Sequence, residues 1–276
     1  MAAAVLWGSP AETQEPALAD VLKRAAAYVA AFEQQLSGIV SEETYRQYVE
    51  NRNFDQFSST TLRSDLLLVK PSDADRYVEL RDVYEAGGGT IREREARLES
   101  LLKQPAADAS IHAIIETSAR YNIGRVRRNI NTPLLTLQFL QAVNQPRFRF
   151  ARAATPAPVF TDARDQDFNG VPTFRVTSEM WAVSYEERGR DTIIKQPTGG
   201  RLPARGRFWI NPADGSVLIS ELILDGGGVK TTVTVSYQTE PLMGFLVPIE
   251  MRESYLTRHE RITGVAEYAK FRPIAR

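Results

Sequence analysis

The stretch Gly206–Leu224, with the sequence GRFWINPADGSVLISELIL, decides the fold of this chain. Two apolar runs flank Asn211-Pro-Ala-Asp-Gly215, a segment whose residue types reverse the chain direction at low cost. The second run carries apolar side chains on both faces, and one of these faces is expected to hold Leu218, Leu222 and Leu224. We therefore predict an antiparallel hairpin whose second strand has apolar neighbours on both sides.

The pattern of short strands and tight turns extends over residues 171–276. Val229–Tyr237 alternates between apolar and polar residues, which is typical of a half-buried strand, and the glycines of Asp225–Gly228 supply a turn before it. A further strand is expected over Thr173–Ala182, and Pro248 predicts an edge strand or a bulge. The C-terminal third is therefore predicted to be an antiparallel meander curled into a barrel or half-barrel.

The N-terminal half begins with one clear helix. Pro16–Ser37 repeats apolar residues at intervals of three and four, and Gly38 suits the left-handed residue that often ends a helix. Strands are expected next over Ile39–Glu50, Thr60–Lys70 and Arg76–Glu85. The period then becomes helical, and Thr132 and Pro133 suit the cap and first residue of a last, unusually apolar helix.

The domain organisation follows from these elements. We predict a single domain over residues 16–276 with a helical insertion at about 91–142, preceded at 1–15 by a tail or a truncated export signal. A signal of that kind would place the protein in the periplasm or outside the cell. No run reaches the roughly 18 apolar residues that a membrane-spanning helix needs, so no membrane span is expected.

Composition excludes several classes of function. The 276 residues include no cysteine, which excludes disulfides, thiolate metal sites and thiol nucleophiles. Lys+Arg and Asp+Glu both number 34, so no overall positive charge favours nucleic acid as a partner.

The sequence also offers no catalytic constellation. His112 and His259 are far apart in the chain, and the acidic residues near Asp162 lack the terminal ligand of a calcium loop. We expect no enzyme activity, no metal and no cofactor.

Several C-terminal segments together resemble the closing strands of the periplasmic lipoprotein-carrier family, the LolA/LolB-like half-barrels. These segments are Gly206–Gly215, Val217–Leu224, Val233–Tyr237, Val247–Glu250, Ala266–Tyr268 and Phe271-Arg272. The resemblance covers roughly the last 70 residues and implies an α+β fold. In that fold an antiparallel sheet curls into a half-barrel, with the N-terminal helix and the helical middle segment packed on its concave face.

The resemblance also implies a non-enzymatic carrier or binding protein for lipids or lipidated proteins. The cavity lining is then expected to include Leu134, Leu137, Phe139, Leu140, Met180, Trp209, Leu218, Leu222 and Leu224. Basic residues expected to contact an anionic group are Arg125, Arg127 and Arg128. The alternative is an interaction or sensor module, a subunit that docks a protein partner and whose apolar interior is an ordinary core without ligand.

Overall fold

The computed structural model describes residues 15–51, 57–70, 77–91, 115–126, 128, 132–154, 165–166, 172–173, 180–189, 191–196 and 198–273. Its helical elements are α1 (Leu18–Leu36) and the 3₁₀ helices η1 (Leu135–Leu140) and η2 (Gln145–Arg147), and residues 115–119 are also helical. Its strands are β1 (Ile39–Asn51), β2 (Phe57–Val69), β3 (Val78–Ala86), β4 (Gly89–Thr90), β5 (Phe148–Arg152), β6 (Asp165–Gln166), β7 (Pro172–Thr173), β8 (Trp181–Glu187), β9 (Arg205–Ile210), β10 (Val217–Gly226), β11 (Val229–Glu240), β12 (Phe245–Leu256) and β13 (Glu260–Pro273).

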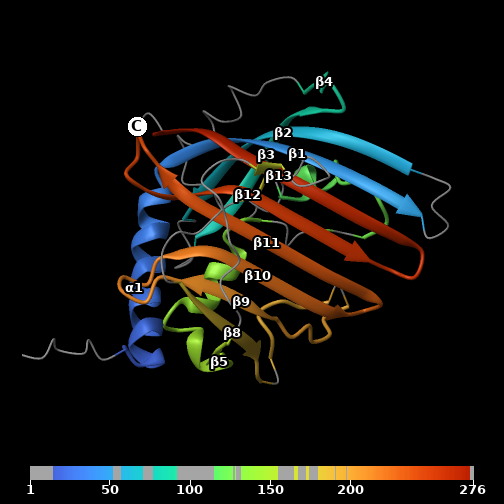
Figure 1. Cartoon of the computed structure of the whole chain (residues 1–276). Coiled ribbons are helices and arrows are strands. Elements are labelled where there is room, and N and C mark those ends of the chain that lie inside the picture. The colour runs from blue at the N-terminus through green and yellow to red at the C-terminus, as the bar shows by residue number, and fades with distance from the viewer. Residues whose placement is uncertain are drawn as a thin grey trace, which may run out of the picture.

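Within the described residues, eleven of these strands form one antiparallel sheet in the order β4-β3-β2-β1-β13-β12-β11-β10-β9-β8-β5. The sheet curls without closing, and α1 lies across one end of its strands (Figure 1), so the α+β half-barrel predicted from the sequence is confirmed. The first and last strands along the chain pair at its centre, with Tyr45 of β1 opposite Ala266 of β13. This pairing joins the N-terminal strand group to the C-terminal meander in a single layer.

Helix α1 packs along one stripe on the face of the sheet that we call the inner face. Its buried residues are Val21, Ala25, Val29, Phe32 and Leu36, which return every three or four positions. They share one core cluster with residues of β8 to β13 and of η1. The helix is slightly shorter than predicted, and Gly38 does not adopt a positive φ because the chain passes directly into β1.

The strands predicted at 39–50, 60–70 and 76–85 correspond to β1, β2 and β3. The strand predicted over Thr173–Ala182 falls largely on residues 174–179, which lie outside the described residues, and β8 begins at Trp181. Pro248 stands beside a bulge, as predicted, because Ser236 pairs with Glu250 and Tyr237 with Pro248.

The prediction that Leu218 shares a face with Leu222 and Leu224 was wrong. The register of β10 against β9 shifts between Val217 and Ile219, so Leu218 occupies a bulge. Beyond the bulge, Leu222 and Leu224 belong to the inner core, whereas Leu218 packs with an outer cluster around Trp209. Leu218 therefore does not share a face with the other two leucines.

The α-helix predicted to begin at Pro133 is also wrong. Only the six residues of η1 are helical there, with 3₁₀ geometry and no side-chain cap at its start. The carbonyl of Pro133 accepts a hydrogen bond from the Tyr237 hydroxyl at 2.5 Å, and Thr136 Oγ1 donates to Ser220 Oγ at 2.7 Å. Hydrogen bonds to side chains of the sheet thus take the place of the backbone hydrogen bonds that an α-helix would form here. The 92–114 part of the expected helical insertion lies outside the described residues.

Candidate functional site

Described residues line a cleft of about 900 Å³, which we call the end cleft. It is lined by Arg125, Val126, Ile194, Lys195, Gln196, Leu202, Leu224, Gly226, Gly227, Gly228, Val229, Thr231, Tyr255, Thr257, Arg258, His259 and Glu260. These residues come from the β10–β11 and β12–β13 turns, from the strand ends beside these turns, and from residues 125–126, 194–196 and 202.

The β10–β11 and β12–β13 turns, whose residues line the end cleft, lie at the strand ends away from α1 (Figure 1). Helix α1 contacts the opposite strand ends, where Arg24 Nη1 donates a hydrogen bond to the carbonyl of Pro212 at 2.6 Å. Gly215 in the same turn approaches the backbone of Arg24 so closely that a Cβ atom would clash with it. The helix therefore covers one end of the half-barrel and leaves the cleft at the other.

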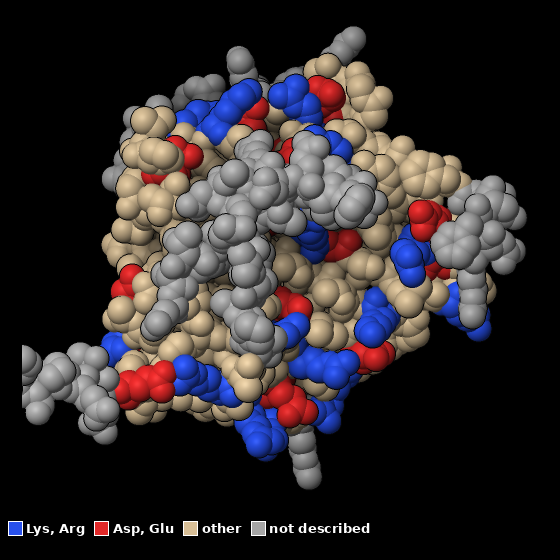
Figure 2. All heavy atoms as spheres, viewed as in Figure 1, with Lys and Arg blue, Asp and Glu red and all other residues tan. Residues whose placement is uncertain are grey.

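The end cleft combines an apolar wall with a basic rim. Ile194, Leu224 and Tyr255 are buried, and their side chains are the apolar base of the cleft. Arg125 and Lys195 are exposed at its margin. Figure 2 shows cationic and acidic side chains side by side along the lower margin of the face in view, below a surface of mostly uncharged side chains. A cleft with these two kinds of surface suits an amphiphilic ligand.

The rim cations differ in their partners. Lys195 Nζ lies 2.8 Å from Asp191 Oδ1, and this hydrogen bond lowers the pKa of Asp191. Arg258 Nε donates to His259 Nε2 at 2.6 Å. The guanidinium of Arg125 makes no ion pair with any described residue, although its backbone N–H donates to Glu260 Oε1 at 2.7 Å. Arg125 is therefore the rim cation best placed to receive an anion.

A second hollow of about 770 Å³ adjoins the first, and we call it the side hollow. It is lined by Val49, Asn51, Phe57, Ser58, Arg125, His259 and Glu260. The last three residues also line the end cleft. Arg125 and His259 thus stand at the junction of two adjacent hollows.

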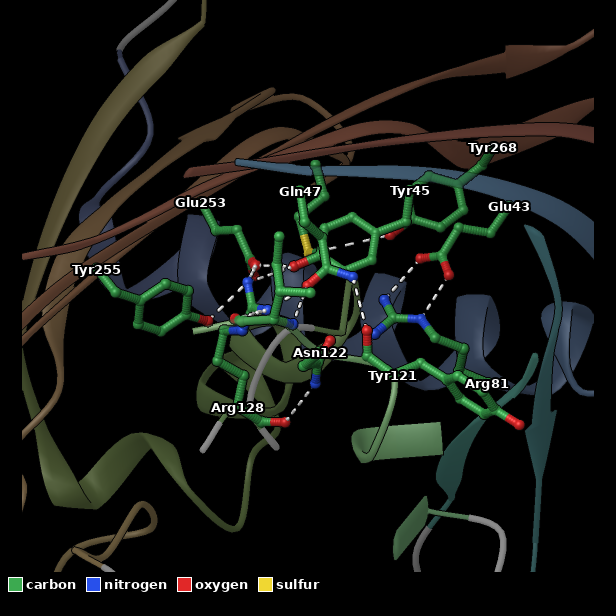
Figure 3. Close-up of polar contacts among 12 residues, drawn as sticks. Glu43, Tyr45, Gln47, Arg81, Tyr121, Asn122, Arg128, Glu253, Tyr255 and Tyr268 are labelled. Atoms are coloured by element: carbon green, nitrogen blue, oxygen red, sulfur yellow. Dashed lines mark hydrogen bonds and ion pairs between the residues drawn. The ribbon is translucent and has the colours of Figure 1, made fainter. Parts of the chain in front are cut away.

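Beside the end cleft, the inner face carries a buried polar cluster formed by Glu43, Tyr45, Gln47, Arg81, Arg128, Glu253 and Tyr255 (Figure 3). Arg128 Nη1 donates to Tyr45 Oη at 2.9 Å and to Glu253 Oε1 at 3.1 Å. The Tyr45 hydroxyl also donates to Glu253, and the Tyr255 hydroxyl donates to the other oxygen of Glu253 at 3.0 Å. Each carboxylate oxygen of Glu253 therefore has a donor.

The polar cluster fixes the loop that carries Arg125. Arg128 Nη2 donates to Gln47 and to the carbonyl of Ile123, and the backbone N–H of Ile123 donates to Gln47 Oε1 at 3.1 Å. Gly124 lies so close to the sheet that an added Cβ would stand 2.5 Å from Ile262 Cδ1. The loop is thus held on the inner face by buried bonds and by close backbone packing.

Three strands place the members of the cluster next to one another. Gln47, Gly264 and Glu253 lie in one row across β1, β13 and β12. Gly264 leaves room for Tyr45, because a Cβ there would stand 2.7 Å from Tyr45 Cε2. Burial, together with the charge of Glu253, raises the pKa of Tyr45 well above its ordinary value, so the hydroxyl remains a donor.

Sequence reasoning missed this cluster. The alternation of β1 places Glu43, Tyr45 and Gln47 on the inner face, but its outer face carries Glu42, Thr44 and Arg46 and is equally polar. Polarity alone therefore does not tell the two faces of β1 apart. One signal in the sequence could have found the cluster: β12 also places polar residues, Glu253 and Tyr255, at alternate positions that face inward.

The residues predicted to line a lipid cavity are divided between three places. Leu134, Leu137, Phe139, Leu140 and Leu222 are packed in the inner core. Met180, Trp209 and Leu218 belong to a separate cluster with Ala182 and Ile219 on the outer face. Leu224 also belongs to the inner core, and it alone among these predicted lining residues lines the end cleft.

The interior of the half-barrel is filled where α1 and η1 pack on the sheet. Phe139 is fully buried, and its ring lies 4.9 Å from that of Phe148 and 5.5 Å from that of Tyr185 between centroids. The small cavity beside Leu134 has a volume of only about 10 Å³, which is room for about one water molecule. Any acyl chain bound without rearrangement therefore has space in the end cleft and not in this core.

The three predicted arginines also have different surroundings. Arg125 lies at the rim described above, and Arg127 lies outside the described residues. Arg128 is buried rather than at the surface, and its charge is balanced by Glu253. Its guanidinium positions the loop and is not exposed to a ligand in the end cleft.

The described residues contain no group of three or more His, Cys, Asp or Glu side chains placed to hold a metal ion. No helix in this part of the chain is both long and apolar enough to cross a bilayer.

Searches of known proteins and structures complete these findings. No protein-family model matches the sequence, and no curated protein matches it significantly. Among solved structures, a domain from Vibrio parahaemolyticus that carries the name outer membrane lipoprotein-sorting protein is similar, with 13% identity, a TM-score of 0.37, and coverage of 90% of this chain and 92% of that one.

Two further solved structures are similar over comparable lengths. A DUF1329 family protein from Desulfovibrio piger has 9% identity and a TM-score of 0.33, and covers 92% of this chain and 93% of its own. A LolA superfamily protein from Nitrosomonas europaea has 10% identity and a TM-score of 0.33, with 91% and 94% covered. At these identities and TM-scores no function is inferred from the likeness, and function has to be argued from the cleft itself.

Proposed function

We propose that this protein is a non-enzymatic carrier or binding protein of the cell envelope that holds the acyl chain of a lipid or lipidated protein in the end cleft. The observation that carries the proposal is the cleft itself, whose volume of about 900 Å³ is within the range of small-molecule sites. Its buried apolar base is contributed by Ile194, Leu224 and Tyr255.

The energetics of such binding require no special chemistry. Each methylene removed from water contributes about 0.8 kcal/mol, so ten buried methylenes contribute about 8 kcal/mol before the cost of association is subtracted. The rim cations then orient the polar end of the ligand toward solvent. Binding of this kind needs neither a nucleophile nor a metal.

The second candidate function is a docking or sensor module with a solid core and no ligand. The filled interior favours it, since Leu137, Phe139 and Leu140 are each no more than 1% exposed. The two candidates differ in what the end cleft does. A carrier binds an acyl chain there, whereas a docking module leaves the cleft to solvent or to a protein partner.

The test combines native mass spectrometry of the purified protein with titration of a fluorescent fatty-acid probe. Val229 lines the end cleft, and Val229→Glu places a charge on its apolar wall. The neighbouring Lys230 is exposed and does not line the cleft, so Lys230→Glu is the matched control. Urea unfolding of both variants verifies that they remain folded.

The carrier proposal predicts a bound acyl lipid in the native mass and probe binding that Val229→Glu weakens at least tenfold. Lys230→Glu should bind the probe as the unmodified protein does. A clean protein mass, together with no saturable probe binding, would refute the carrier and favour the docking module.

A further inference from the structure

The position of Arg125 between the two hollows bears on the chemistry of the ligand. Arg125, His259 and Glu260 line both the end cleft and the side hollow. The end cleft has the apolar base described above, whereas the side hollow is bordered by the polar side chains of Asn51 and Ser58 together with Val49 and the exposed ring of Phe57. A molecule that occupies both hollows passes Arg125, and beyond it meets mainly polar side chains in place of the apolar base of the end cleft.

Both segments that meet at this junction are held in place. The backbone N–H groups of His259 and Glu260 donate to Thr257 Oγ1 at 3.1 and 2.9 Å, which fixes the β12–β13 turn. On the other side, Arg125 follows Gly124, whose backbone packs directly on β13. The junction is thus preorganised, which lowers the entropic cost of binding.

The charges at the junction favour an anion on Arg125. Glu260 is 7% exposed, and its Oε1 already accepts the backbone N–H of Arg125. The guanidinium of Arg125 forms no ion pair with any of the residues that the structure describes. A guanidinium offers paired donors that match the oxygens of a phosphate or carboxylate.

We propose that the ligand is a phospholipid whose acyl chain lies in the end cleft, whose phosphate contacts Arg125 and whose polar head group lies in the side hollow. This inference rests on the proposed function. A phosphodiester continues on both sides of its charge, with an apolar chain on one side and a polar group on the other. A fatty acid ends at its carboxylate and leaves the side hollow empty.

The experiment measures the affinity of four compounds for the protein and for Arg125→Gln. They are lysophosphatidylglycerol, the monoacylglycerol of the same chain length, the corresponding fatty acid, and inorganic phosphate. Arg261→Gln is the control, because Arg261 is an exposed arginine near the same turn that lines neither hollow. Displacement of the fluorescent fatty-acid probe reports binding of each compound.

We expect Arg125→Gln to weaken lysophosphatidylglycerol about ten- to hundredfold, as for the loss of a charge-assisted hydrogen-bonded pair. Monoacylglycerol should bind both forms alike, and Arg261→Gln should bind every compound as the unmodified protein does. Inorganic phosphate should not displace the probe at concentrations where the phospholipid does.

Three results would overturn the inference while leaving acyl-chain binding intact. If lysophosphatidylglycerol and monoacylglycerol bind with equal affinity, the phosphate makes no contact that contributes to binding. A fatty acid that binds as tightly as the phospholipid, with the same dependence on Arg125, shows a carboxylate site. Displacement by inorganic phosphate that depends on Arg125 shows a site for the free ion. Failure of all amphiphiles to bind refutes the proposed function itself.

Discussion

Replacement of Arg128 by methionine is the sharpest test of the buried polar cluster. The side chains of Arg128 and Glu253 are both 0% exposed, and their closest atoms are 3.1 Å apart. Methionine has a similar length but provides no donor, so the variant leaves the Glu253 carboxylate buried without a countercharge. Removing one partner of a buried ion pair costs about 3–5 kcal/mol. We expect Arg128→Met to lower the free energy of unfolding by this amount.

The same substitution at the surface is the matched control. Arg46 lies 3.0 Å from Glu267, but the two side chains are 41% and 36% exposed. Solvent screens such a pair, and its net contribution is about 0–1 kcal/mol. We therefore expect Arg46→Met to cost less than about 1 kcal/mol. The difference between the two variants isolates burial as the cause.

Urea unfolding followed by tryptophan fluorescence measures both variants, because Trp181 and Trp209 lie on β8 and β9. A third variant, Arg128→Met with Glu253→Gln, removes the unpaired charge. It should recover part of the stability that Arg128→Met loses. The account of the cluster would be contradicted if Arg128→Met lowered the free energy of unfolding by less than about 1 kcal/mol. It would also be contradicted if the loss in the double variant equalled the sum of the losses in Arg128→Met and Glu253→Gln.

Three further predictions concern packing and protonation. Gly264→Ala should lower the free energy of unfolding in urea by about 1–3 kcal/mol, because its Cβ would stand 2.7 Å from Tyr45 Cε2. Gly38→Ala is the control: its Cβ would meet no atom within 4 Å, so the variant should be neutral or stabilising by up to about 1 kcal/mol. Phe139→Ala should lower the free energy of unfolding by about 3–5 kcal/mol, and a loss below about 1 kcal/mol would show that the interior is loosely packed. Burial raises the pKa of Glu79 from 4.5 to about 8, so between these pH values the folded state holds a proton that the unfolded chain releases. The stability that comes from the protonated Glu79 is fully present below pH 4.5 and is lost as the pH rises to about 8. Relative to Glu79→Gln, the unmodified protein should therefore lose stability between pH 5 and pH 8, and a constant difference across this range would refute the assignment.

The strands were largely predictable because their signal is local. The alternation of Val229–Tyr237 and the turn residues at 211–215 predict β11 and the β9–β10 hairpin without reference to the rest of the chain. Pro248 likewise predicted an edge strand or a bulge, since proline cannot donate a backbone hydrogen bond within a sheet, and the structure has the bulge.

The candidate site was predictable only in part. Leu224 and Arg125 were selected from the sequence and both line the end cleft. Tyr255 and Lys195 were not selected, because nothing near them in the sequence marks them as neighbours of Arg125. The cleft is assembled from turns and loops more than 130 residues apart in numbering, such as Arg125 and Arg258.

The sequence by itself determined the amphipathic first helix, the antiparallel strands and most turns, because each depends on the spacing of residues within a short segment. Only the tertiary structure decided that β1 pairs with β13, that a bulge moves Leu218 to the outer face, and that Arg128 balances Glu253 in the interior. The physical reason is that these features depend on register and burial. Both are settled when distant segments pack together, and they leave no periodic trace in the sequence.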